Sequence, residues 1–106
     1  MAKLSTMEGK PRIPPDALGK LCKEGRDVAS YLFQVPDDEA QWQRLREIVQ
    51  AILKEARATK RRELPRIAQE MNDALSDKPT AQTAELMQSG FDRMFRLWQA
   101  ARSGLF

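Results

Sequence analysis

The stretch DDEAQWQRLREIVQAILKEAR, residues 37–57, decides the fold of this chain. Its apolar side chains recur at steps of three and four residues, at Trp42, Leu45, Val49, Ile52 and Ala56. That spacing places them on one face of an α-helix, which Ile48 and Leu53 widen into a core-facing stripe. Asp37 or Asp38 can cap the start of the helix, where negative charge also favours the helix dipole. The stretch therefore predicts an amphipathic helix of about twenty residues, which would span ~30 Å.

Three further stretches carry apolar residues at helical spacing. We expect helices over residues 15–34, from about 64 to 75 and from about 80 to 103. The first of them contains Gly19 and Gly25, and each glycine weakens a helix by up to roughly 1 kcal/mol relative to alanine. The first helix is therefore expected to be the least regular, with a bend or an interruption.

Short connections join the expected helices, and short connections make successive helices antiparallel neighbours. The strict alternation of apolar and polar residues that marks a strand is missing. We therefore predict an all-α fold, an antiparallel up-down four-helix bundle that occupies residues 15–106 as one domain. Residues 1–14 show no helical period and include Gly9 and Pro11. A flexible N-terminal tail is predicted there.

The residue types of common catalytic and metal sites are scarce. The chain has no His and one Cys, which excludes a catalytic triad, His-based acid–base catalysis and a zinc site of Cys and His ligands. Its glycines do not form a phosphate-binding loop. Cys22 falls on the apolar face of the first helix, where a thiol packs in the core. We predict a protein that is not an enzyme, with no catalytic residues, no metal site and no cofactor.

The cellular location of the protein is predicted from features that its sequence lacks. No stretch approaches the 18 apolar residues of a membrane helix, and the start has no secretory signal pattern. A single Cys allows no disulfide within the chain. These features predict a cytoplasmic protein without a membrane partner.

The most suggestive polar feature is a basic cluster where the second helix ends and the third begins. Only Glu63 offsets its members, which are Arg57, Lys60, Arg61, Arg62 and Arg66. Cations favour the end of one helix but disfavour the start of the next, so helix formation explains only part of the cluster. Three interpretations remain: a solvated turn, a docking surface for an acidic protein, or a phosphate or nucleic-acid site. No aromatic residue is interleaved, which disfavours nucleic acid.

Two neighbouring segments, QAILKEAR at 50–57 and ELPRIAQEMNDAL at 63–75, resemble the central helix pair of histidine phosphotransfer domains from bacterial two-component signalling. Ala51 stands at the position of the phosphoaccepting His. Leu53 and Lys54 match the residues that follow it, and Glu55 replaces a Gly. The resemblance implies a four-helix bundle that cannot carry phosphate on His. It also implies that Ala51 and Lys54 lie on the solvent side, where such domains meet receiver domains.

These observations together predict a non-catalytic protein–protein interaction module, a small signalling or regulatory adaptor similar to an inactive phosphotransfer domain. Its partner is expected to be another protein, with a receiver-like domain as one candidate. The predicted partner-binding residues are Gln50, Ala51, Lys54, Arg57, Lys60, Arg61 and Arg62. The alternative is a nucleic-acid-associated protein that uses the basic turn 57–66. A homo-oligomer formed through apolar side chains of the fourth helix also stays open, and Trp42 is either a core residue or a partner anchor.

Overall fold

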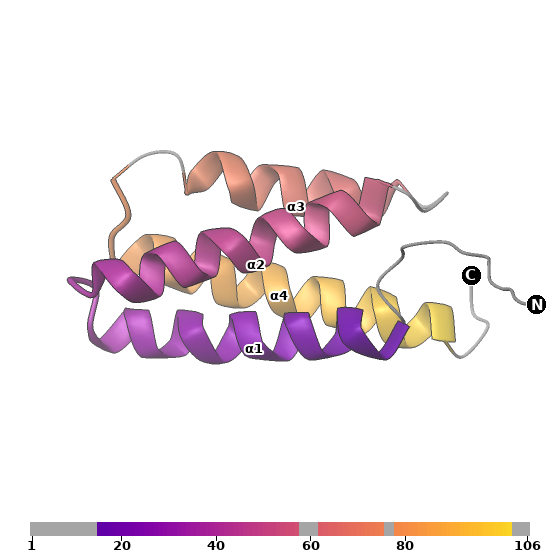
Figure 1. Ribbon diagram of the computed structural model, residues 1–106, viewed down its shortest axis with the longest axis horizontal. Helices are drawn as coiled ribbons and strands as arrows, with labels where there is room; N and C mark the ends of the chain where they lie inside the picture. Colours follow the sequence, from indigo (N-terminus) through magenta and orange to yellow (C-terminus); the bar gives the residue numbers. More distant parts are fainter. Residues whose placement is uncertain (1–14, 58–61, 76–77, 103–106) are drawn as a thin grey trace, which may run out of the picture.

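A computed structural model describes residues 15–57, 62–75 and 78–102 of the chain. These residues form the helices α1 (Pro15–Gln34), α2 (Glu39–Arg57), α3 (Glu63–Ala74) and α4 (Ala81–Arg102), and no strand occurs among them. Successive helices run in opposite directions, and α1 also packs extensively against α4 (Figure 1). The predicted all-α, antiparallel up-down four-helix bundle is confirmed. The predicted tail lies outside the described residues.

The cap that starts α2 is Asp38. Its Oδ1 accepts a hydrogen bond from the backbone N–H of Gln41 at 3.2 Å, while Oδ2 accepts one from the Tyr31 hydroxyl at 2.7 Å. The Tyr31 hydrogen bond lowers the pKa of Asp38 below its ordinary value and raises that of Tyr31. The side chain of Asp38 thus links the last turn of α1 to the first turn of α2. Asp38, one of the two residues predicted for this role, is the N-cap of α2.

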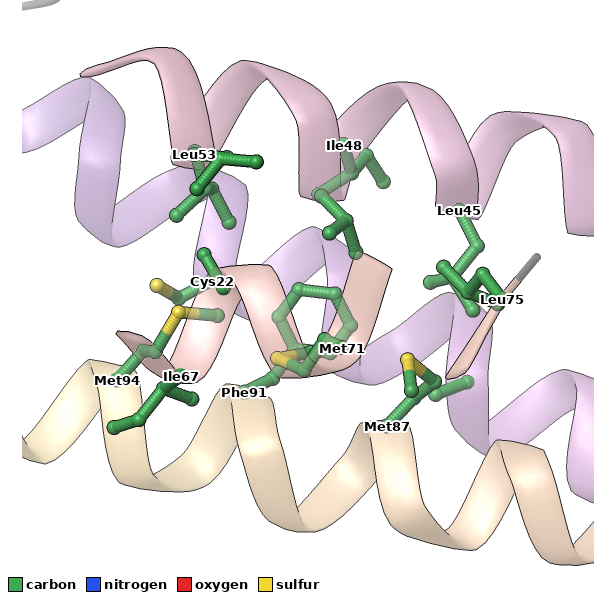
Figure 2. Close-up of a cluster of buried hydrophobic side chains, with 14 of the residues drawn as sticks. Cys22, Leu45, Ile48, Leu53, Ile67, Met71, Leu75, Met87, Phe91 and Met94 are labelled. Atoms are coloured by element: carbon green, nitrogen blue, oxygen red, sulfur yellow. The ribbon is translucent and has the colours of Figure 1, made fainter. Parts of the chain in front are cut away.

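The core contains the apolar stripes of all four helices. Its largest fully buried side chains include Trp42 and Phe91, which are 0% exposed. The Nε1 of Trp42 donates a 2.8 Å hydrogen bond to the backbone oxygen of Pro36, so its one polar atom is satisfied. Trp42 is therefore a core residue and not an exposed anchor. The buried sulfur-containing side chains Cys22, Met71, Met87 and Met94 belong to the same core cluster as Phe91 (Figure 2).

The expected interruption of α1 is wrong, because the helix is continuous from Pro15 to Gln34. Its two glycines instead allow close approach of α4. Gly25 lies against the ring of Phe91, and Gly19 lies against the indole of Trp98. The weaker helix propensity of glycine is outweighed here by the packing that its missing side chain permits.

None of the helices in the described part of the chain has the length and apolar character to cross a membrane.

Candidate functional site

The outer face of α2 carries the first part of the predicted partner-binding surface. Gln50 and Lys54 are exposed on successive turns, and Ala51 is half-buried between them. The ammonium of Lys54 forms no ion pair with a described residue. Glu55, which stands at the Gly position of the resemblance, is buried with 9% of its surface exposed. The face thus presents one unneutralised cation beside an amide that can both donate and accept hydrogen bonds.

Arg57, at the end of α2, contacts α3. Its Nη2 donates a 2.7 Å hydrogen bond to the Oε1 of Gln69, and the Nε2 of Gln69 in turn donates to Asp73 at 2.9 Å. This chain of hydrogen bonds ties the side chain of Arg57 to the neighbouring helix. Arg57 therefore has a structural role in addition to any contact with a partner.

Arg66 is the neutralised member of the basic cluster. Its guanidinium pairs with Glu63 at 2.5 Å and with Glu70 at 3.1 Å, one helical turn away on either side. These carboxylates, Glu63 first, raise the pKa of Arg66 above its ordinary value. The expectation that only Glu63 offsets the cluster is corrected, since Glu70 contributes as well. Both carboxylates act on the same arginine.

Arg62 is exposed just before α3 and forms no ion pair or hydrogen bond through its side chain within the described part of the chain. Lys60 and Arg61, the two remaining predicted residues, lie outside the described residues. The structure therefore places Gln50, Ala51 and Lys54 on α2, and it places Arg57 and Arg62 beside the turn at the end of that helix.

Sequence analysis missed cations that the fold gathers at this same end. Because α1 begins and α4 ends at the same end of the bundle as the end of α2 and the start of α3 (Figure 1), the halves of α1 and α4 nearest that end bring four further exposed cations toward it. They are Lys20, Lys23, Arg93 and Arg96. We call this end of the bundle, with Lys54, Arg57 and Arg62, the basic end. The antiparallel order of the predicted helices, combined with the position of each charge along its helix, could have revealed this grouping.

The opposite end of the bundle is predominantly acidic. Exposed carboxylates there include Asp37, Glu39 and Glu85. The separation is incomplete, since Glu63 lies at the basic end, while Lys78, Arg44 and Arg46 lie in the acidic half. The bundle nonetheless presents surfaces of different sign at its two ends, which orients an approaching charged partner.

Cys22, the single cysteine of the chain, is buried in the core. Burial raises the pKa of the Cys22 thiol to about 12, so the reactive thiolate is scarce at neutral pH. No group of three or more His, Cys, Asp or Glu residues in residues 15–57, 62–75 and 78–102 is placed to hold a metal ion.

Comparison with protein-family models, with curated proteins and with solved structures found no match to this chain. The resemblance to phosphotransfer domains therefore stays a prediction that rests on residues 50–57 and 63–75.

Proposed function

We propose that this protein is a non-catalytic interaction module that docks on an acidic surface of another protein through the outer face of α2 and the turn that follows. The observation that supports this proposal best is the contrast between neighbouring cations. Arg66 is neutralised by two carboxylates, whereas Lys54 and Arg62 are exposed and unpaired within the described residues. Unpaired cations at the surface can bind partner carboxylates without first breaking an internal ion pair.

The resemblance to phosphotransfer domains makes a receiver-like domain the favoured partner. Lys54 stands on the face where those domains meet receivers, and Ala51 beside it has no nitrogen that could accept phosphate. The module would then act in cytoplasmic signalling as an adaptor that occupies a receiver without transferring phosphate to it.

The docking surface is tested with the paired substitutions Lys54→Glu and Arg62→Glu. The matched control is Lys20→Glu with Lys78→Glu, which changes the net charge equally at two exposed, unpaired sites outside the outer face of α2, one on α1 at the basic end and one just before α4. We expect the first pair to weaken binding to purified receiver domains at least about tenfold, a loss of ~1.4 kcal/mol. The control pair should retain binding. Both proteins should keep the helical signal of the wild type in circular dichroism, because exposed substitutions usually change stability by less than about 0.5 kcal/mol.

Three results would count against the proposal. Receivers that fail to bind the wild type would remove the favoured partner, and equal weakening by both pairs would show non-specific charge attraction. Binding of an oligonucleotide, with an affinity that falls steeply as salt increases, would favour the nucleic-acid alternative through residues 57–66.

A further inference from the structure

The seam between α3 and α4 opens into a groove toward the basic end of the bundle. The two helices approach closely at Gly90, where a Cβ would lie 2.5 Å from the Sδ of Met71. Farther along the seam lies a groove of about 280 Å³ lined by Glu63, Ile67, Arg93, Arg96 and Leu97. Ile67 is 2% exposed and Leu97 is half-buried, so the floor of the groove is apolar.

The other long seam of α4, which faces α1, is bridged by side chains. Arg26 pairs with Asp92 at 2.7 Å, and the Nε2 of Gln88 donates a 2.6 Å hydrogen bond to the Oγ of Ser30. These contacts join α1 and α4 at Arg26 and Ser30, while a smaller groove of about 180 Å³, lined by Lys20, Lys23 and Trp98 among others, opens along the same seam toward the basic end. The groove between α3 and α4 has no comparable bridge among the described residues, so its rim remains available to a ligand.

The rim of the groove carries positive charge that the fold does not use. The side chains of Arg93 and Arg96 form no ion pair or hydrogen bond within residues 15–57, 62–75 and 78–102. The carboxylate of Glu63 across the groove is already bound by Arg66. Two like charges three residues apart on a helix repel each other. The helix dipole does not account for them either, because α4 continues to Arg102 and the dipole acts within the last turn.

We propose that this groove binds an acidic amphipathic helix of a partner protein. An apolar side chain of that helix would cover Ile67 and Leu97, while its carboxylates pair with Arg93 and Arg96. A guanidinium group binds a carboxylate through two parallel hydrogen bonds, and a helix in a groove anchors itself by apolar residues spaced three or four apart. The apolar floor favours such a helix over a free anion, which would leave the floor in contact with water. The groove lies on the seam between α3 and α4, whereas Lys54 lies on α2; the two surfaces meet near Arg62, which directly precedes Glu63 of the groove.

The test uses the full chain with isotopically labelled isoleucine methyl groups. The probe is a synthetic amphipathic helix with leucines on one face and glutamates beside them, titrated while methyl spectra are recorded. We expect the methyl signal of Ile67 to shift, while that of Ile48 on α2 stays in place. The same peptide with lysine instead of glutamate should cause no shift. An unchanged Ile67 signal overturns the proposal.

Charge-reversal variants provide a second test of the groove. Arg93→Glu with Arg96→Glu should weaken the peptide at least about tenfold, and the Lys20→Glu, Lys78→Glu pair should not. Peptide binding that is weakened by Lys54→Glu alone and left unchanged by the Arg93, Arg96 reversal would place the peptide on α2 and reject the groove. A second copy of this chain is the other possible occupant of the groove, and sedimentation without peptide tests for it. Self-association that is abolished by Arg93→Glu with Arg96→Glu would assign the groove to that second copy and overturn the proposal. If inorganic phosphate displaced the peptide from the groove as well as unlabelled peptide does, the groove would be an anion site, and the proposal of a helical ligand would be rejected.

Discussion

Gly25 of α1 lies directly against the ring of Phe91 on α4, and a Cβ at position 25 would overlap the ring carbons. Both residues are buried. The helix that contains Gly25 is continuous, so the glycine does not serve a turn or an unusual backbone conformation. Its function is to leave room for an aromatic side chain of the neighbouring helix, which allows α1 and α4 to pack closely.

Gly25→Ala should therefore destabilise the protein, although alanine is the better helix former by up to about 1 kcal/mol. Overpacking a filled core usually costs about 1–3 kcal/mol, which exceeds that gain. Chemical denaturation should show a lower midpoint. Combining Gly25→Ala with Phe91→Leu should lose less than the sum of the two single changes, because the smaller side chain vacates the overlapped space.

Gly19→Ala is the internal comparison for this prediction. A Cβ there would lie 2.5 Å from the Cη2 of Trp98, at the outer edge of a half-buried ring. Because the ring of Trp98 is half-buried and that of Phe91 is fully buried, we expect Gly19→Ala to cost less than Gly25→Ala. A larger loss at Gly19 would show that the crowding at Gly25 is relieved by some other movement.

The core residues Phe91 and Ile52 are both 0% exposed and lie on different helices. We expect Phe91→Ala to lower the free energy of unfolding by about 3–5 kcal/mol and Ile52→Ala by about 2–5 kcal/mol. Leu86→Ala is the matched control because Leu86 is 55% exposed. Its denaturation midpoint should remain close to that of the wild type. A small effect at either core site would contradict the packing described above.

The buried thiol of Cys22 should make stability depend on pH in alkaline solution. Its pKa is raised by burial from 9.0 to about 12 in the folded protein. Between these values the unfolded chain releases the thiol proton while the folded protein keeps it. This contribution to the free energy of unfolding is therefore complete below pH 9 and is lost as pH rises toward 12.

Urea denaturation midpoints at mildly and strongly alkaline pH would measure this dependence in the wild type and in Cys22→Ala. We expect the midpoint of the wild type to fall more steeply with pH, because groups such as Tyr31 titrate in both proteins and only the wild type has the thiol. Parallel pH profiles would mean that the thiol is solvated in the folded state.

The four helices and their order could be predicted from the sequence, because helical periodicity and capping depend on nearby residues. The spacing from Trp42 to Ala56 predicted the buried face of α2, and Asp38 was one of two candidates for its cap. Local charge spacing could also have predicted that Arg66 pairs with Glu63 and Glu70 on the same helix.

The sequence by itself determined the helices and the buried stripe of each one, because these depend on residues within a few positions of one another. Only the tertiary structure decided which residues of different helices contact one another. It turned Gly25 from an expected weak point into a contact for Phe91, and it joined Arg57 of α2 to Gln69 of α3. It also brought Arg93 of α4 to the groove beside α3. Such contacts join residues far apart in the chain, and their partners are set by how the helices pack and not by local spacing.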